Sequence, residues 1–299
     1  YCISSENNAL NTYNYIKELD NNCIYRIDNK TSFTEIYNPK INILNNKRKL
    51  CLFEYIYFQN ANTKIYGGIS KNIEYENKYS LNVYNKITVY NFRENLGRML
   101  GRTEKINKTK YKFFNNYYNS NNIIVIGAPD TGIPYGIGFA KELNFPYKQF
   151  INKVKNQKRS FILNTDEKRI EQIKKKFIID DQINIKNKIV YFVDDSLVRG
   201  NTIKIIINLL KEYKPKEIHI RIGAPKLLYP CYYGIDIPTK EELIMNKYTE
   251  NEFKKHYKIN SIRFLDLKNY NDIMKALDSN VSKFCTSCFT GKYLKEYDF

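Results

Sequence analysis

Residues 188–202 read KIVYFVDDSLVRGNT and join an apolar run to two adjacent carboxylates and a loop that contains glycine. Every residue of the run 189–193 is β-branched or aromatic, which is typical of a strand buried on both faces. Asp194 and Asp195 therefore lie at the carboxyl end of a strand, where open α/β sheets bind ligands. Apolar residues at helical spacing follow from Ile203 onward. The stretch predicts a strand, a binding loop and a helix, in that order.

The loop after the acidic pair predicts a site for a phosphorylated ribose. Its polar and flexible residues are Ser196, Arg199, Gly200, Asn201 and Thr202. The backbone N–H groups and the dipole at the start of the next helix favour a phosphate dianion. Two carboxylates can accept hydrogen bonds from vicinal ribose hydroxyls, or hold Mg²⁺ beside a pyrophosphate. The competing interpretation is a strand end with two solvated aspartates, and the combination of strand, acidic pair and loop disfavours it.

Several segments, in one order along the chain, resemble a single family. VDDSLVRGNT at 193–202 resembles the loop with which type I phosphoribosyltransferases bind phosphoribosyl pyrophosphate (PRPP), in the version found in amidophosphoribosyltransferases. The supporting segments are SSENNAL at 4–10, CLFEYIYF at 51–58, GAPDTG at 127–132, CYYGIDIPTKEELI at 231–244 and FTGKYLKE at 289–296. The resemblance implies an α/β fold of the type I phosphoribosyltransferase class, with a mostly parallel sheet and flanking helices.

The resemblance also implies two parts. Residues 1–50 resemble the end of an N-terminal-nucleophile glutaminase domain, and residues 51–299 resemble the phosphoribosyltransferase domain. The rest of the glutaminase half is not among the 299 residues. Cys2 is not a convincing nucleophile, because its surroundings resemble the end of that domain. The family's ARPDS after FEYIYF is replaced by QNANT at 59–63.

Strands and helices alternate from residue 51 onward, which predicts a mostly parallel sheet. We expect strands at 123–127, 146–151, 189–193 and 217–222. We expect helices at 92–100, 134–143, 166–177, 202–213, 241–245 and 272–277. The polar stretches 60–86 and 103–122 are rich in Asn, Lys and Tyr. We expect them to be surface insertions with little order.

The resemblance assigns binding roles residue by residue. It implies that ribose and 5-phosphate are bound by Asp194, Asp195, Ser196, Val198, Arg199, Gly200, Asn201 and Thr202. It implies a pyrophosphate loop at Pro129, Asp130, Thr131 and Gly132, and a Mg²⁺ site at Thr131, Asp194 and Asp195. A plain turn is the alternative for PDTG taken alone. Transfer of the ribosyl group builds negative charge on the departing pyrophosphate, so the site must hold anions and exclude water.

A basic segment resembles the mobile catalytic loop of the family. The residues assigned to catalysis are Lys153, Arg159 and Lys176. The family pattern is approximately KNRYVGRTFI, whereas residues 153–162 read KVKNQKRSFI. An aromatic residue and a glycine are thus missing at Asn156 and Lys158. A solvated basic face is the alternative for the basic residues of this segment other than Lys153 and Arg159.

The spacing of Cys285 and Cys288 suits two ligands of one metal centre. The resemblance to the iron–sulfur branch of the family implies a [4Fe-4S] cluster held by Cys51, Cys231, Cys285 and Cys288. Zinc is the alternative metal, and a disulfide is disfavoured in a cytosolic enzyme. Cys2 and Cys23 have no matching role, and we expect ordinary thiols there.

The formal net charge of +18 suggests nucleic acid or an anionic membrane as a partner. We discount it, because lysine, asparagine, isoleucine and tyrosine are abundant throughout the chain, as A/T-rich codons would produce. We expect no nucleic-acid partner and no membrane span, since no apolar run approaches the ~20 residues required. The only histidines are His219 and His256, which disfavours a histidine-based triad. The chain does not begin like a signal peptide, and we expect a cytoplasmic protein that forms a homo-oligomer.

The resemblance as a whole implies an amidophosphoribosyltransferase. Such an enzyme forms 5-phosphoribosylamine from PRPP and glutamine-derived ammonia, in the first step of purine synthesis. Without its glutaminase half the chain is expected to use free ammonia. Two alternatives stay open: a regulator with this fold that senses PRPP without turning it over, and a degraded, inactive enzyme.

Overall fold

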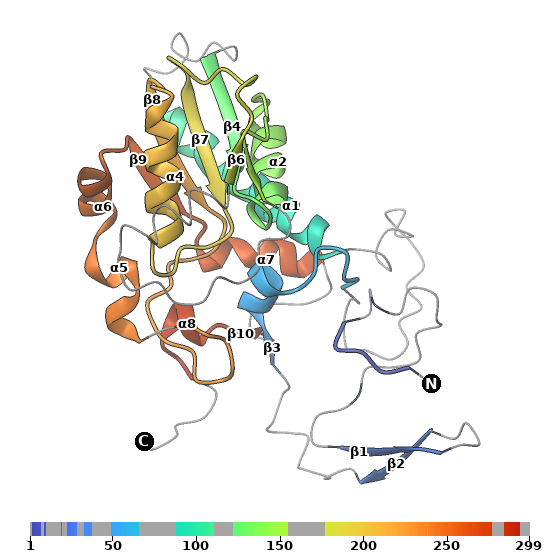
Figure 1. The fold of residues 1–299 in the computed structure, drawn as a ribbon. Helices are drawn as coiled ribbons and strands as arrows, with labels where there is room; N and C mark the ends of the chain where they lie inside the picture. The colour runs from blue at the N-terminus through green and yellow to red at the C-terminus, as the bar shows by residue number, and fades with distance from the viewer. Residues whose placement is uncertain are drawn as a thin grey trace.

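A parallel sheet forms the centre of the protein (Figure 1). The structure is a computed structural model, and it describes residues 2–6, 9, 19, 23–28, 33–37, 49–65, 88–110, 122–154, 177–237, 239–276 and 284–293, without the side chains of 105–110, 272 and 274–276. The sheet has the order β4-β7-β8-β9, and all three pairings are parallel. Its strands are β4 (Ile123–Gly127), β7 (Ile189–Asp194), β8 (Glu217–Ile222) and β9 (Ser261–Phe264). The expected strands 123–127, 189–193 and 217–222 are confirmed, and β9 was not predicted.

The strand order reverses between β4 and β7. Residues 146–148 lie along the edge of β4 that faces away from β7, because Val125 N–H donates to Pro146 O (2.8 Å) and Lys148 N–H donates to Val125 O (2.9 Å). The expected strand 146–151 is thus wrong in its bounds: only a bridge forms at Tyr147. The regular strand is β5 (Ile151–Lys153), which pairs antiparallel with β6 (Phe177–Ile179). Such a reversal point in an α/β sheet is where ligands bind.

The helices that flank the sheet agree with the expected ones in place. Helix α2 (Gly132–Leu143) packs on β4 and β7 and against α1 (Val89–Lys110), and α4 (Asn201–Glu212) follows β7. The expected 241–245 is split into the 3-10 turn η5 (Lys240–Glu242) and α5 (Ile244–Lys247), and 272–277 lies mostly within α7 (Leu267–Ala276). Helix α6 (Glu250–Tyr257) was not predicted; it starts at a capping box between Thr249 and Glu252. The expected helix 166–177 lies outside the described residues except for Phe177, which is in β6.

Both expected insertions are corrected where the structure describes them. Residues 103–110 continue helix α1, because the Glu104 side chain turns inward and pairs with buried Arg221. Thr63 and Ile65 are buried, and Thr63 O accepts a hydrogen bond from Val89 N–H (2.9 Å) at the start of α1. The remainder of both stretches, residues 66–87 and 111–121, lies outside the described residues.

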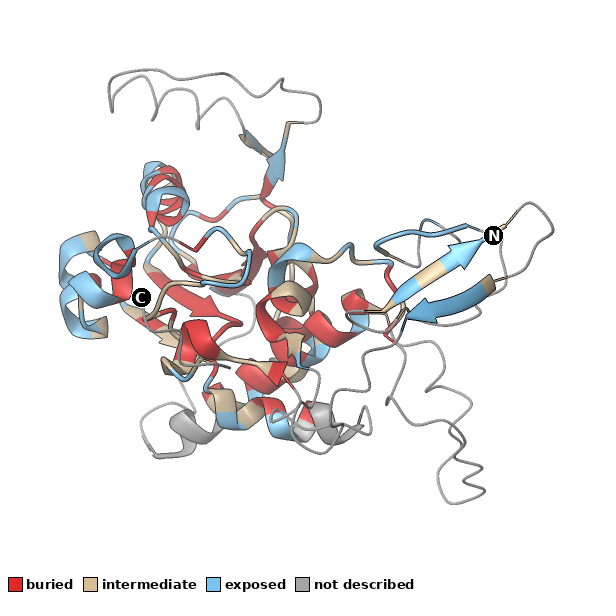
Figure 2. Ribbon diagram, turned by 90° about the horizontal axis from the view of Figure 1, so that it is seen from below, coloured by how far each residue is buried: buried red, intermediate tan, exposed pale blue. Residues whose placement is uncertain are grey.

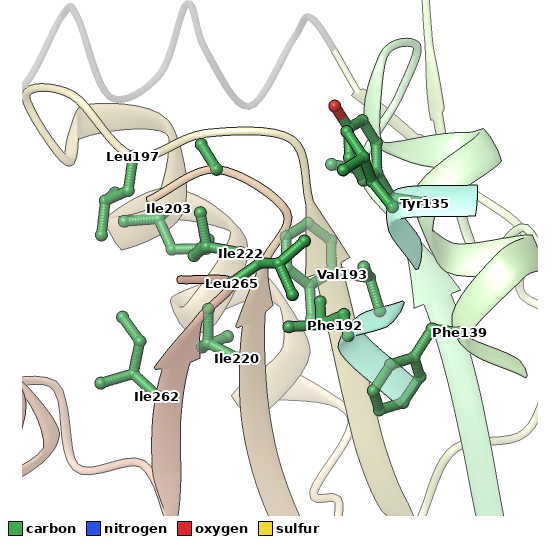
Figure 3. Packing of buried hydrophobic residues seen from close by; sticks show 14 of the residues in the cluster. Tyr135, Phe139, Phe192, Val193, Leu197, Ile203, Ile220, Ile222, Ile262 and Leu265 are labelled. Atoms are coloured by element: carbon green, nitrogen blue, oxygen red, sulfur yellow. The ribbon is translucent and has the colours of Figure 1, made fainter. Parts of the chain in front are cut away.

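The core consists of apolar side chains on the strands and on the faces of the helices turned toward them (Figure 2). Phe192 and Val193 of β7 and Ile220 and Ile222 of β8 lie at its centre (Figure 3). Helices α1 and α2 approach closely because Gly138 faces the backbone: a Cβ there would lie 1.9 Å from Glu94 O. This contact fixes the start of α2 and the loop before it.

Residues 284–293 lie against the segment near residue 50. Strands β3 (Leu50–Cys51) and β10 (Phe284–Cys285) pair in parallel, and α8 (Ser287–Thr290) follows. The hairpin of β1 (Ile24–Ile27) and β2 (Phe33–Tyr37) projects away from the sheet (Figure 1). The division of the chain after residue 50 stays a prediction. Among the described helices, none combines the length and apolar character needed to cross a membrane.

Candidate active site

A cavity of about 690 Å³ opens at the carboxyl ends of β4 and β7. Residues from both predicted loops line it: Pro129, Asp130, Thr131, Asp194, Asp195, Ser196, Val198, Arg199, Gly200, Asn201 and Thr202. Gly132 lies next to them as the first residue of α2. The structure thus brings together the two segments that the sequence predicted to bind one ligand, although more than sixty residues separate them.

The acidic pair joins the two loops. The Thr131 hydroxyl donates a 2.5 Å hydrogen bond to Asp195 Oδ1, and the Ser196 hydroxyl donates a 2.7 Å bond to Asp195 Oδ2. The Asp195 N–H donates to Asp194 Oδ1 (2.9 Å). Asp195 is 3% exposed. Neither carboxylate forms an ion pair with a described lysine or arginine.

Burial raises the pKa of both carboxyl groups of this pair. Burial raises the pKa of Asp194 well above its usual range, and the negative charge of Asp195 raises it further. Burial also raises the pKa of Asp195, while hydrogen bonds from Ser196 and Thr131 and the nearby charge of Arg93 act in the opposite direction. Asp195 is buried and Asp194 is half-buried, and two carboxylates beside a hydroxyl are hard oxygen ligands of the kind that suit Mg²⁺.

The loop before α4 has a backbone suited to binding an anion, and Glu242 and Ile244 contact the loop. Gly200 has φ +82°, and a Cβ there would lie 2.1 Å from Ile244 Cδ1, so the position requires glycine. Ile244 N–H donates to Val198 O (2.9 Å). Arg199 Nε lies 3.0 Å from Glu242 Oε2, which turns this side chain toward the supporting segment. The twelve-residue helix α4 begins directly after the loop, with its N–H groups toward the cavity end of the sheet.

The loop after β4 carries the second predicted binding segment. The peptide bond between Pro129 and Asp130 is cis. A Cβ at Gly132 would lie 2.9 Å from Val193 O, so the loop contacts the end of β7 directly. Lys153, on β5, places its Nζ 3.9 Å from Asp130 Oδ2 at the cavity. Arg159 and Lys176, the other two residues assigned to catalysis, lie outside the described residues.

Sequence patterns did not indicate several other residues that line the cavity. Phe53, Tyr57 and Phe58 line one side of the cavity, and Ile235, Asp236 and Ile237 line another. Both groups lie in segments that resemble the family, CLFEYIYF and CYYGIDIPTKEELI. The resemblance therefore pointed to these two segments, but the sequence does not show which of their side chains point into the cavity.

The four cysteines of the predicted metal centre lie in one region. Cys51 and Cys285 are register partners in the β3–β10 pair, and Cys288 O accepts hydrogen bonds from Leu228 and Tyr229 N–H (both 3.1 Å), just before Cys231. Burial raises the pKa of Cys51 to about 11. Burial also raises the pKa of Cys288, as do the charges of Cys51, Cys231 and Cys285. All six cysteines are free thiols.

The closeness of the four cysteine segments does not by itself make the thiols a set of metal ligands. Within the described part of the chain, no group of three or more His, Cys, Asp or Glu side chains is arranged to hold a metal ion. The thiols are soft donors of the kind that thiolate-bound centres use, and the β3–β10 pairing and the bonds to Cys288 O bring their segments together. Cys2 is exposed, and Cys23 is half-buried before β1, far along the chain from this region.

Comparison with known proteins identifies the class. Residues 94–224 match the family model of the phosphoribosyl transferase domain. The chain therefore carries a phosphoribosyltransferase domain of type I, with the cavity at its expected edge.

The narrower relationship covers nearly the whole chain. The amidophosphoribosyltransferase of Methanocaldococcus jannaschii is 30% identical over 99% of this chain, and that of Bacillus subtilis is 28% identical over 99%. The solved structure of glutamine PRPP amidotransferase from B. subtilis, complexed with ADP and GMP, superposes with a TM-score of 0.72 at 26% identity and covers 98% of this chain. The chain corresponds to the phosphoribosyltransferase part of an amidophosphoribosyltransferase. It spans 57% and 55% of the two relatives and 57% of the solved chain.

Proposed function

We propose that this chain transfers the 5-phosphoribosyl group of PRPP to ammonia, giving 5-phosphoribosylamine and pyrophosphate in the first step of purine synthesis. The observation that carries the proposal is the acidic pair at the cavity: Asp195 is buried and bonded through Thr131 to the second loop, and Asp194 lies beside it. The names of the relatives support the same reaction.

Each loop has a separate task in this proposal. Asp194 and Asp195 accept hydrogen bonds from the ribose hydroxyls, and the loop before α4 binds the 5-phosphate with its backbone N–H groups. The loop 129–132 faces the pyrophosphate, and Lys153 stabilises the charge that develops on it. Mg²⁺, held by Thr131 and the acidic pair, would neutralise part of the pyrophosphate charge. The cavity walls exclude water from the anomeric carbon.

The nitrogen source is ammonia in this proposal. Release of ammonia from glutamine needs an activated nucleophile and an oxyanion site, and neither is identifiable in residues 1–50. Ammonia needs no such activation once it is deprotonated. The 299 residues alone should therefore use ammonium salts, with a rate that rises with pH as NH₃ replaces NH₄⁺.

Pyrophosphate release with each nitrogen donor tests the proposal. We expect release from PRPP with ammonium chloride and Mg²⁺, and none above background with glutamine. Turnover with glutamine would contradict the ammonia assignment. No turnover with either donor, in a protein that binds PRPP, would contradict the transferase activity and favour an inactive or sensing protein.

We further propose that Cys51, Cys231, Cys285 and Cys288 hold a [4Fe-4S] cluster. The support is the gathering of these thiols between β3, β10 and the segment before Cys231, together with the resemblance to the cluster-binding branch of the family. Zinc is the alternative for the same thiolates. We also propose that the protein is cytoplasmic and forms a homo-oligomer, as the sequence led us to expect.

A further inference from the structure

One side of the cavity is an aromatic wall, which we define as Phe53, Tyr57 and Phe58. The wall belongs to the π-helical segment η2 (Glu54–Phe58) and the residue before it. The ring centroids of Phe53 and Tyr57 are 5.8 Å apart, and those of Tyr57 and Phe58 are 5.3 Å apart. Burial raises the pKa of Tyr57, and the negative charges of Asp195 and Asp194 raise it further. The wall and the acidic pair line the same cavity.

A single buried guanidinium binds the end of η2. Arg93, in the first turns of α1, is 2% exposed. Its Nε donates to Tyr55 O (3.0 Å), and its Nη2 donates to Tyr57 O (2.9 Å) and Gln59 O (2.8 Å). The carbonyls at a helix end lack partners within the helix. Arg93 supplies partners at the point where the wall ends.

A second buried donor binds the same segment from the other helix. The Tyr135 hydroxyl donates to Ile56 O (3.1 Å), and Tyr135 is fully buried. Tyr135 lies in α2, which starts directly after the loop 129–132. The wall is thus attached to both α1 and α2, and these helices pack closely at Gly138.

The wall matters because two nucleophiles compete at the anomeric carbon. Attack by ammonia forms a C–N bond while the C–O bond to pyrophosphate breaks; pyrophosphate leaves with the electron pair, and the nitrogen loses a proton to solvent. Attack by water gives ribose 5-phosphate, pyrophosphate and a proton instead. Tyr57 and Phe58 are 42% and 56% exposed, so a bound substrate can cover their rings. A wall that stays in contact with the substrate favours ammonia, because it excludes ordered water from the reacting carbon.

We propose that Arg93 is a positioning residue that holds the aromatic wall over the acidic pair and thereby limits attack by water. The inference rests on the proposed transfer to ammonia. Arg93 forms no described hydrogen bond to either loop that binds PRPP. Its charge lowers the pKa of Asp195, and Arg93→Lys keeps that charge, so the variant isolates the contacts that act through the backbone of Tyr57 and Gln59. Lysine cannot replace it, because an ammonium group lacks the planar fork that reaches three separate carbonyls.

Arg93→Lys tests the proposal against Arg221→Lys as a matched control. Arg221 is also buried (1% exposed), and it binds Glu104 through Nε (3.0 Å) and Nη2 (3.1 Å); neither residue lines the cavity. In Arg93→Lys we expect the ratio of ribose 5-phosphate to phosphoribosylamine to rise about tenfold, which corresponds to ~1.4 kcal/mol of barrier. The ratio in Arg221→Lys should equal that of the unsubstituted chain. Equal ratios in both variants would overturn the proposal, because loss of a buried arginine would then explain the effect.

A fluorescence measurement keeps the test independent of turnover. The chain has no tryptophan, so Phe53→Trp places a single reporter at the buried member of the wall, where Phe53 is 2% exposed. We expect acrylamide to quench this reporter several-fold more strongly when Arg93→Lys is added, and no more strongly when Arg221→Lys is added. Equal quenching in all three proteins would overturn the positioning role. Increased quenching in a protein that never releases pyrophosphate would support the positioning of the wall and refute the transfer reaction.

Discussion

The hydroxyl of Thr131 lies 2.5 Å from Oδ1 of Asp195 and donates a hydrogen bond to it. Thr131 ends the loop after β4, and Asp195 follows β7, so this bond crosses the point at which the strand order reverses. A ligand that contacts both loops therefore meets one connected set of polar groups. The relationship predicts that the two loops act together in binding.

Removal of this hydroxyl should weaken binding of PRPP. Thr131→Val keeps the shape of the side chain but leaves Asp195 with one fewer donor. We expect a loss of about 1–3 kcal/mol in the free energy of PRPP binding with Mg²⁺, the range for a hydrogen bond to a charged group. Thr131→Ser restores the hydroxyl and should bind within a few-fold of the unsubstituted chain. Calorimetry measures both, and equal weakening by Ser and Val, or normal binding by Val, would contradict a specific role for the hydroxyl.

The acidic pair should make the free protein less stable as pH rises. Because burial raises the pKa of Asp194 in the folded state, the folded chain holds more protons than the unfolded chain above the ordinary carboxyl pKa of about 4. Asp194→Asn removes this cost. We expect it to raise the free energy of unfolding at pH 8 by about 0.5–2 kcal/mol, with little change at pH 4. Urea denaturation at both pH values measures it, and a loss of stability at pH 8 would contradict the prediction.

The four clustered cysteines should bind iron. Protein purified without oxygen should be brown and contain about four iron and four sulfide per chain. Cys285→Ser should lose the iron, because it removes one of the paired thiols in the β3–β10 contact. Cys23→Ser, outside this region, should keep it. A colourless protein with one zinc per chain would show that the thiolates hold the other metal.

The buried ion pair between Arg221 and Glu104 should be important for stability. Their side chains are 2% and 7% exposed, and Arg263 Nη1 also lies 3.2 Å from Glu104 Oε2. Glu104→Gln leaves a buried guanidinium without its carboxylate, and we expect a loss of about 3–5 kcal/mol in the free energy of unfolding. Glu142→Gln is the control, since Glu142 pairs with the exposed Arg102 at 3.5 Å and should cost no more than ~1 kcal/mol. Thermal denaturation of both variants decides whether burial sets the difference.

Local sequence patterns correctly predicted the features that depend only on residues adjacent in the chain. The apolar run before Asp194 fixed both the strand and the place of the acidic pair at its end. The cysteine spacing pointed to one region because Cys285 and Cys288 share a short segment. Cys51 lies near Cys285 because β3 pairs with β10, and no local sequence pattern predicts that pairing.

Long-range contacts explain what the sequence could not predict. Helix α1 continues past Leu100 because Glu104 meets Arg221, more than a hundred residues away. The aromatic wall faces the cavity because Arg93 and Tyr135 bind backbone carbonyls of its segment. Every residue has a backbone carbonyl, so the sequence does not show which ones are bound. The bounds of the predicted strand 146–151 were wrong because the sequence PYKQFI does not reveal that the pairing partner changes from β4 to β6.

Calorimetric titration with PRPP, with and without Mg²⁺, tests the central claim most directly: that the acidic pair and the two loops form one PRPP site. The unsubstituted chain should bind PRPP with Mg²⁺ and much more weakly without it, because the buried carboxylates need a cation between them and the pyrophosphate. The double variant Asp194→Asn and Asp195→Asn should show no measurable binding, whereas Asp266→Asn, at an exposed carboxylate, should bind normally. Undiminished affinity in the double variant would contradict the account.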